Sequence, residues 1–407
     1  MDQRTSDRSG DATTEFERDV VNLMLETVRT VAKQERDDVG TESLLSALVS
    51  GDEPAGSAIA PGMRAAGTLG GSIACRGTSV WVSGDEGDGT AGSPDDEREI
   101  DAFWREVRQE EVRRLRWKRR KEDVAPGGIE LPPMTGALRA CLRLALEAAH
   151  AEGTLSVRVR HVARALVELP DTRAREAMVV EKLDVSAASA ALDALRGKDE
   201  TPEPGSVLML RKAGTFGKSG NPLTRKFTAW IFGGGAGFGS AVVGVVRSEA
   251  RRGAVRRGAP ELEPVDVLLG ILALERSLTV AGRELPEQLA GANRGAELLR
   301  RHGVRQAAVA RVLLPTTGVV EGEPQEVEAS AGFDRRLLHV TQLTASANGS
   351  PTVGTTHLLA ALLDEAGTGA DSVAAIERVL TESGADVAGL RAEPELRVSR
   401  GVAAPGA

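Results

Sequence analysis

A glycine-rich stretch near the middle of the chain has residue types that could hold a phosphate. The apolar run Val207–Leu210 is followed by Gly214–Ser219, which ends in Gly-Lys-Ser. A strand, a glycine-rich turn and Gly-Lys-Ser outline a nucleotide-binding P-loop. Two features disagree: Lys212 stands where the motif needs its first glycine, and Gly-Asn-Pro interrupts the helix that should begin at Lys218. A nucleotide-binding enzyme using residues 207–219 stays an alternative, and a surface turn is the simpler interpretation.

The histidines and cysteines lack the spacing of a catalytic or metal site. The five histidines are scattered, and the sequence has no Gly-x-Ser-x-Gly elbow, no Cys-x-x-Cys and no His-x-x-x-His. Cys75 and Cys141 are too few for a disulfide framework, which favours a reducing, cytoplasmic location. We therefore expect a protein that is not an enzyme and that uses no cofactor and no metal.

A dense basic stretch could bind an acidic partner. Residues 113–121 read Arg-Arg-Leu-Arg-Trp-Lys-Arg-Arg-Lys, on a charged helix predicted from about Asp95 to Glu122. Cations beside an aromatic ring could contact phosphates and stack on a base. The alternatives are an acidic protein partner, nucleic acid bound through 105–121, and a solvated helix whose last cations suit the helix dipole. The candidate partner-binding residues are Trp104, Arg113, Arg114, Arg116 and Trp117.

A ten-residue phrase near the N-terminus recurs more than three hundred residues later. Residues 39–48 read VGTESLLSAL and residues 353–362 read VGTTHLLAAL, with seven of ten positions identical. This identity indicates an internal repeat. Each phrase predicts a loop that turns into a helix, with a glycine at the turn, a threonine as N-cap and leucines facing a core. Glu42 would lie in the first helical turn, where the helix dipole favours an acid.

The flanking residues extend both copies. A helical pattern runs from Phe16 to Lys33 before the first copy and from Phe333 to Ala345 before the last. After the last copy, Val373–Ala385 ends in Leu-Thr-Glu-Ser-Gly-Ala. Together these segments resemble the N-terminal repeat domain of the Clp/Hsp100 unfoldases, of the ClpC type. In that family, helical repeats of roughly 75 residues carry a phrase like V/I-G-T-E-H-L-L, and two repeats pack into one domain.

With this resemblance in view, two degenerate copies can be placed between the clear ones. One runs from Met134 through a phrase at 161–167, and the other from Phe238 through a phrase at 264–272. The resemblance implies an all-α fold of two tandem Clp N-like domains, each a pseudo-twofold pair of half-repeats. The predicted order is a disordered segment 1–15, half-repeat 1 at 16–68, an insertion with the charged helix at 69–133, half-repeat 2 at 134–197, a linker at 198–237, half-repeat 3 at 238–314, a linker at 315–330, half-repeat 4 at 331–395 and a tail at 396–407. Inside the insertion we expect a short strand-like piece at 79–82.

The resemblance also implies a binding site. In ClpC-type domains the glutamate of each Gly-Thr-Glu-His phrase helps to hold phosphoarginine. At the matching positions this chain has Glu42, Arg160, Val265 and Thr356, so only Glu42 keeps the carboxylate that a guanidinium needs. The candidate ligand-binding residues are Glu42, Thr41, Thr355, Thr356 and His357. The simpler interpretation is a first-turn acid at 42 and a packing or capping histidine at 357.

Composition narrows the possible partners. The net charge of -8 argues against nucleic acid or an anionic membrane as the main partner, and no apolar run is long enough to span a membrane. The family's ATPase modules, of several hundred residues each, are absent, so we expect no unfoldase activity. Freestanding relatives without those modules are thought to sequester ligands or to modulate the Clp machine. The expected partners are therefore a Clp ATPase, its adaptors, its substrates or its cyclic-peptide ligands, and the Ala-, Arg- and Gly-rich composition resembles an actinobacterial chain.

Overall fold

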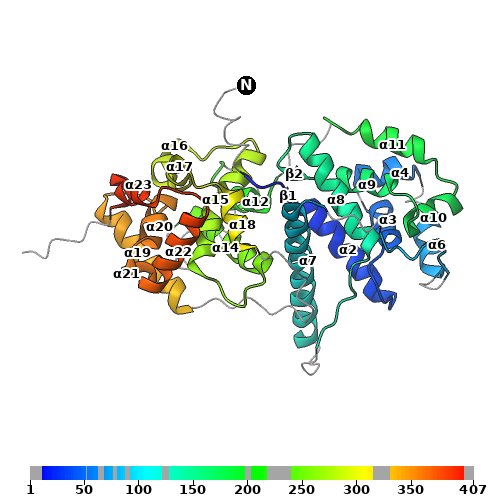
Figure 1. The fold of residues 1–407 in the computed structure, drawn as a ribbon, viewed down its shortest axis with the longest axis horizontal. Coiled ribbons are helices and arrows are strands. Elements are labelled where there is room, and N and C mark those ends of the chain that lie inside the picture. Colours follow the sequence, from blue (N-terminus) through cyan, green and yellow to red (C-terminus); the bar gives the residue numbers. More distant parts are fainter. Residues whose placement is uncertain are drawn as a thin grey trace, which may run out of the picture. The chain divides into compact units, whose positions relative to one another are not determined.

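The computed structural model describes residues 12–51, 53–62, 68–76, 80–87, 92–121, 128–197, 203–217, 240–314 and 331–397. The described chain is essentially all-α, as predicted, and its only named strands among these residues are two-residue pieces. It divides into two compact units (Figure 1). Of the described residues, 14–197 belong to the N-terminal unit, and 12–13, 203–314 and 331–397 belong to the C-terminal unit. No helix of the described residues is both long and apolar enough to cross a membrane.

The N-terminal unit is built from two runs of helices with an insertion between them. Its elements are β1 (Glu15–Phe16), α2 (Arg18–Lys33), α3 (Thr41–Ser50), α4 (Pro54–Ile59), α6 (Thr68–Arg76), α7 (Pro94–Lys121), α8 (Gly136–Ala151), β2 (Ser156–Val157), α9 (Val159–Glu168), α10 (Arg173–Val180) and α11 (Val185–Asp193). Helix α3 is the centre of this unit, because its residues from Thr41 to Val49 are all buried. Helices α2 and α8 each turn one apolar stripe toward the core, as their helical spacing predicts.

The two runs of the N-terminal unit pair with each other through the residues just before their helices, which we call lead-in segments. Strand β1, which precedes α2, pairs in parallel with β2, which precedes α9. Val39, which precedes α3, pairs in parallel with Met134, which precedes α8. One run is α2, α3 and α4, and the other is α8, α9 and α10. In each run, the residues before the first helix pair with the residues before the second helix of the other run. Helix packing repeats this exchange, since α10 packs on α3 and α4 packs on α9.

The C-terminal unit follows the same order of helices. Its elements are α12 (Gly205–Lys212), α14 (Ala241–Arg257), α15 (Pro264–Val280), α16 (Glu287–Ala290), η1 (Gly291–Asn293), α17 (Gly295–Arg301), α18 (Gln306–Leu313), α19 (Ala331–Ala347), α20 (Thr355–Leu362), α21 (Glu365–Thr368), α22 (Ala370–Glu382), α23 (Val387–Ala392) and η2 (Pro394–Leu396). Helix α17 packs on α20, and α22 packs on α15. With the short elements α16, η1 and α21 left out of the count, the two runs here are α14, α15, α17 and α19, α20, α22. The packing is then the exchange seen in the other unit, with α17 and α22 in the places of α10 and α4.

Three expectations about segments are wrong. The range 198–237 is not all linker, because α12 buries Val207 and Leu210, three residues apart, against α14 and α15. Residues 12–15 are described, and Glu15 belongs to β1 because its amide donates to the carbonyl of Leu155. In the expected tail, Leu396 is buried in the core of its unit.

Other expectations fall partly or wholly outside the described residues. Val80 and Val82 are described and belong to no strand. The terminal segments 1–11 and 398–407, the linker 315–330 and residues 218–237 of the expected first linker lie outside the described residues. The charged helix is present as α7, one residue from the predicted bounds at each end.

Candidate functional site

The first repeated phrase begins α3, and a carboxylate from the insertion holds its first turn. The expectation of a threonine N-cap is wrong for both phrases, because Thr41 and Thr355 are already the first helical residues and the N-caps are Gly40 and Gly354. The backbone amide of Thr41 donates to Asp85 Oδ2 at 2.8 Å, and the Thr41 hydroxyl donates to Asp85 Oδ1 at 2.6 Å. The Thr41 oxygen also accepts from the amide of Ala174, in α10, at 3.0 Å. Thr41 therefore joins the start of α3 to the start of α10.

Asp85 is a residue that sequence reasoning did not identify. Its side chain also accepts from the Thr135 hydroxyl at 2.8 Å and from the Arg173 amide at 3.2 Å, and the residue is 1% exposed. One carboxylate thus contacts the first residue of α3, the N-cap of α8 and the first residue of α10. It stands in a glycine- and aspartate-rich loop without periodicity, so no local pattern distinguishes it from its neighbours.

Glu42 is enclosed by the chain's own arginines. Its Oε1 atom accepts from Arg36 Nη1 at 2.7 Å and lies 3.7 Å from Arg173 Nη1. Arg173 also forms a two-pronged pair with Asp38, at 2.6 and 3.0 Å. Burial raises the pKa of Glu42, while the positive charges of Arg173 and Arg36 act in the opposite direction. Because Glu42 is 0% exposed, a guanidinium from another molecule would have to displace one of these arginines.

Gly40 permits this arrangement by having no side chain. A Cβ atom there would stand 2.2 Å from Glu42 Oε2 and 3.0 Å from Arg173 Nη1. The backbone of Gly40 is extended, with φ at −99°, so the requirement for glycine comes from the close approach of the carboxylate and not from the backbone conformation.

The last repeated phrase begins α20 and makes matching contacts. The amide of Thr355 donates to Asn293 Oδ1 at 3.0 Å, and its hydroxyl oxygen accepts from the amide of Gly295, in α17, at 3.1 Å. The hydroxyl oxygen of Thr356, which replaces Glu42, accepts from the Arg294 amide at 2.9 Å. Thr355 and Thr41 therefore act alike, each joining the second helix of one run to the third helix of the other.

His357 caps its own helix. Its Nδ1 atom accepts from the amide of Gly354 at 3.2 Å, and burial lowers its pKa, which favours the neutral ring that this hydrogen bond needs. His161 makes the same contact with Arg158 in α9. The five candidate ligand-binding residues are all buried, at 0–5% exposure, and none of them lies at the surface: Glu42, Thr41, Thr355, Thr356 and His357.

The two tryptophans of the charged helix α7 differ in exposure. Trp104 is 2% exposed and belongs to the core of the N-terminal unit, so the expectation that it contacts a partner is wrong for this structure. Trp117 is 64% exposed. Arg114 is held by Glu111, and Arg113 Nη2 lies 3.8 Å from Glu110. Arg116, next to Trp117 in the sequence, is half-buried and has a partner of its own.

The P-loop outline has the wrong secondary structure. Val207–Leu210, expected as its strand, lies inside helix α12, so the chain cannot lead from a strand into the glycine-rich turn there. Gly214 and Gly217 do have left-handed φ angles, of +86° and +104°. Lys218 and Ser219 lie outside the described residues.

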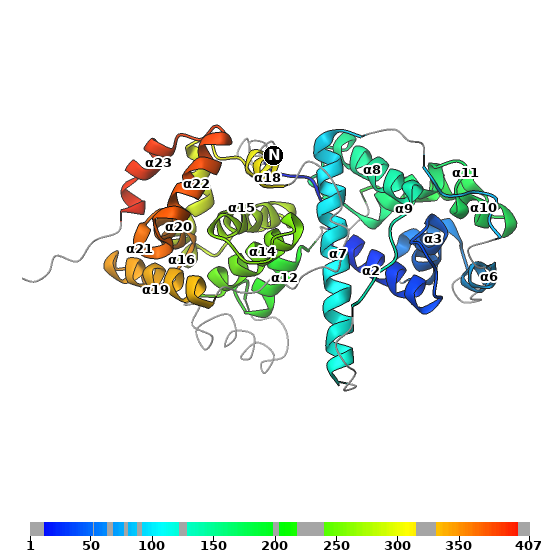
Figure 2. The same ribbon diagram turned by 60° about the horizontal axis from the view of Figure 1, so that its bottom comes forward.

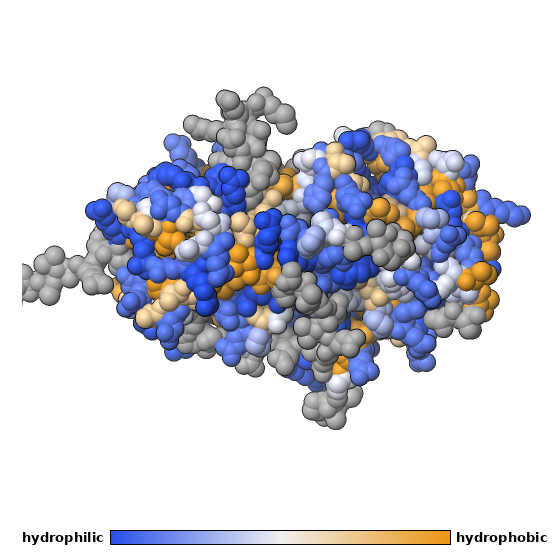
Figure 3. Space-filling model, in the orientation of Figure 1, coloured by the Kyte–Doolittle hydropathy of each residue, from blue (hydrophilic) through white to orange (hydrophobic). Residues whose placement is uncertain are grey.

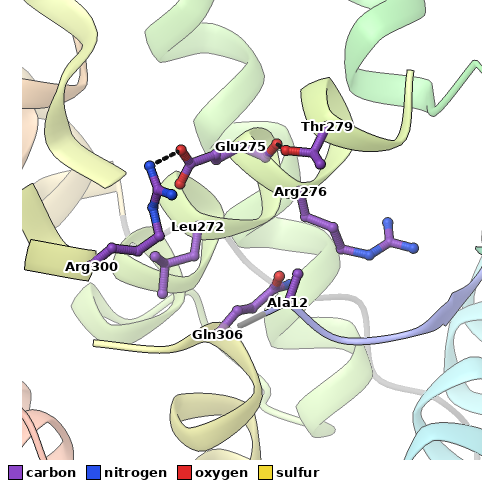
Figure 4. Close-up of a pocket in the computed structure, with 7 residues that line it drawn as sticks. All are labelled: Ala12, Leu272, Glu275, Arg276, Thr279, Arg300 and Gln306. Atoms are coloured by element: carbon purple, nitrogen blue, oxygen red, sulfur yellow. Dashed lines mark hydrogen bonds and ion pairs between the residues drawn. The ribbon is translucent and has the colours of Figure 1, made fainter. Parts of the chain in front are cut away.

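The C-terminal unit has a small polar cavity between α15, α17 and α18 (Figure 4). Its volume of about 20 Å³ holds a water molecule and excludes an organic ligand. Its lining residues are Ala12, Leu272, Glu275, Arg276, Thr279, Arg300 and Gln306. Within the part of the chain that the structure describes, no group of three histidine, cysteine or acidic side chains is placed to hold a metal ion.

Comparisons with protein-family models, with curated proteins and with solved structures found no match to this chain.

Proposed function

We propose that this chain is a non-enzymatic, cytoplasmic binding protein made of two domains like the N-terminal repeat domain of the Clp/Hsp100 unfoldases. Its role in this proposal is to bind components of the Clp system, or to sequester peptide or antibiotic ligands that a Clp ATPase would otherwise meet. The observation that carries the proposal is the exchange of lead-in segments, β1 with β2 and Val39 with Met134. Two half-repeats related by a pseudo-twofold axis would make this pair of contacts.

The threonines of the two clear phrases support the same interpretation. Thr41 accepts from the amide of Ala174, and Thr355 accepts from the amide of Gly295. Both donors stand in the first turn of the third helix of the opposite run, α10 or α17. A single contact that recurs in both units, between corresponding helices, favours a duplicated domain over chance resemblance of a ten-residue phrase.

The geometry also limits how this domain would bind. The pairing of Glu42 with Arg36 and Arg173 favours a ligand that does not depend on a free carboxylate at this phrase. Phosphoarginine recognition through Glu42 is therefore not part of the proposal. We place binding instead on the outer helix surfaces, where a peptide, an adaptor or a cyclic peptide could pack.

Calorimetric titration tests the proposal directly. The purified full-length chain is titrated with a purified ClpC-type ATPase and, separately, with a cyclic peptide that binds the N-terminal domain of that ATPase. The proposal expects saturable binding in at least one titration, which Glu42→Ala should leave unchanged in any variant preparation that remains folded. No saturable heat in either titration would contradict it.

A further inference from the structure

The basic end of α7 extends beyond the helices that α7 packs against. The first part of the helix buries Phe103 and Val107 in the core, and its last fully buried residue is Val112. Figure 2 shows α7 continuing past α2 and α8 of its own unit. The residues from Arg113 onward are exposed or half-exposed, and Leu115 is the one among them that packs partly against the core. The rest of this stretch is therefore a convex helix surface.

One face of this extension combines cations with an exposed aromatic ring. Arg113, Trp117, Arg120 and Lys121 follow at helical spacings of four and three residues, so they share a face. The Arg113 side chain is 62% exposed and Trp117 is 64% exposed. The Lys121 ammonium lies 5.4 Å from the centre of the Trp117 ring. We call these four residues the basic face.

The two acidic residues just before the basic face, Glu110 and Glu111, make contacts of their own. No acidic residue stands from Arg113 to Lys121, and Glu122 and Asp123 follow in the sequence. Glu111 is 1% exposed, and it turns inward to accept from Arg29 Nε at 2.9 Å. Glu110 lies 3.8 Å from Arg113, a loose pair at the surface. Among the described residues, Arg113 is therefore the one cation of the basic face with an acidic partner.

The spacing of these charges suits a nucleic-acid strand. On the basic face, Arg113 and Lys121 stand eight residues apart, which at a rise of about 1.5 Å per residue is about 12 Å along the helix, and Arg120 lies beside Lys121. Cations spread over this length can contact more than one phosphate of the same strand, because phosphates recur about every 3.4 Å along one strand of B-DNA. The net charge of -8 belongs to the whole chain, and salt screens exposed charges beyond about 10 Å, so the local cations dominate at contact.

We propose that the basic face binds single-stranded nucleic acid, with the cations contacting phosphates and Trp117 stacking on a base. The exposed indole favours a single strand over a duplex, because unpaired bases offer their ring faces and paired bases do not. It also favours nucleic acid over an acidic protein, since this convex helix has no apolar stripe beside Trp117 that would enter a protein groove. The proposal does not depend on any relation to the Clp system.

Fluorescence anisotropy tests it, with a labelled 20-nucleotide oligothymidine titrated by the full-length chain at several salt concentrations. Trp117→Ala should weaken binding about tenfold, the order expected for the loss of one stacked base. Arg120→Gln/Lys121→Gln should weaken binding and reduce the steepness of its salt dependence by about 0.7 for each phosphate that the variant no longer neutralises. The matched control is Lys33→Gln/Arg283→Gln, which removes two exposed cations elsewhere and should leave binding close to that of the parent.

Circular dichroism at 222 nm checks that every variant keeps its helices, and only folded variants count. Absence of binding at low salt would overturn the proposal. Equal affinity of the control and the Arg120/Lys121 variant would overturn it as well. Binding of duplex DNA as tight as the oligothymidine, with no loss in Trp117→Ala, would refute stacking. Tighter binding of polyglutamate than of oligothymidine would instead point to an acidic protein partner.

Discussion

The guanidinium of Arg173 lies 3.7 Å from Glu42 Oε1, joining the third helix of one run to the second helix of the other. The same guanidinium pairs with Asp38. Arg36 also donates to Glu42 Oε1, at 2.7 Å, and to the carbonyl of Ile73. The Glu42 carboxylate thus pairs with arginines of its own domain, and through Arg173 it connects the two runs.

Glu42→Gln tests how much this charge interaction stabilises the N-terminal unit. The substitution keeps the shape of the side chain and removes the charge that faces two arginines. Removing one partner of a buried charge pair is strongly destabilising, and the raised pKa of Glu42 moderates the loss, so we expect a decrease of about 2–4 kcal/mol in the free energy of unfolding. Urea unfolding followed by tryptophan fluorescence, to which the buried Trp104 of this unit contributes, measures it.

The control for Glu42→Gln is Glu26→Gln on α2. Glu26 is 55% exposed and lies 3.7 Å from Arg29, so its loss should cost less than about 0.5 kcal/mol. If the two substitutions destabilised the protein equally, Glu42 would not hold the two runs together.

Asp85→Ala should loosen the insertion from both runs. Asp85 accepts from the amide and hydroxyl of Thr41, from the hydroxyl of Thr135 and from the amide of Arg173. These groups would be left buried without their acceptor, which should cost about 3 kcal/mol or more. Hydrogen exchange should quicken at the amides of Thr41 and Arg173. Asp184→Ala, which removes the N-cap of α11, serves for comparison and should cost about 1 kcal/mol.

Gly354→Ala should destabilise the C-terminal unit. A Cβ there would stand 2.2 Å from the carbonyl oxygen of Ala292, a backbone atom that cannot move without shifting η1. We expect a loss of about 1–3 kcal/mol, measured by calorimetric unfolding. Gly253→Ala is the matched control, because Gly253 lies inside α14 with open space around its Cβ position. That change should stabilise the helix by about 0.5–1 kcal/mol, and a loss there would contradict the steric explanation.

Stability should fall in acid partly through Glu152. Hydrogen bonds from Arg160, above all, and from His161 lower the pKa of Glu152 to about 2, against an ordinary value of 4.5. A lowered pKa in the folded state means that the unfolded chain binds the proton more readily. The stabilisation is therefore present above pH 4.5 and is lost as the pH falls toward 2.

Glu152→Gln should accordingly reduce stability at pH 7 by about 1 kcal/mol and flatten the decline between pH 4.5 and 2. Urea midpoints of parent and variant, measured across this range, should converge at the acid end. Parallel curves would show that Glu152 has no part in the acid response.

The sequence was a good guide wherever a local pattern decides the structure. The bounds of α7 follow from acids in its first turn, cations in its last turn and a glycine-rich stop, and α2 follows from apolar residues at helical spacing. The expectation that Trp104 contacts a partner was wrong, although Ile100, Phe103 and Val107 share its face of the helix, a spacing that favours burial.

Long-range contacts could not be predicted in the same way. Asp85 and Arg173 are 88 residues apart, and their roles at the start of α3 depend on how the runs pack. The short apolar run Val207–Leu210 fits a strand or a helix equally well, and burial against α14 and α15 selects the helix. On the face shown in Figure 3, hydrophobic residues reach the surface in small separate areas, which no sequence pattern specifies.

The most direct test of the proposed role measures casein degradation by a purified ClpC-type ATPase with its peptidase, with and without the full-length chain, and with and without a cyclic peptide that deregulates the ATPase. We expect the chain, in molar excess over the peptide, to restore the rate seen without peptide, or to change the basal rate when no peptide is added. Rates that are identical with and without the chain under all conditions would contradict a role in the Clp system.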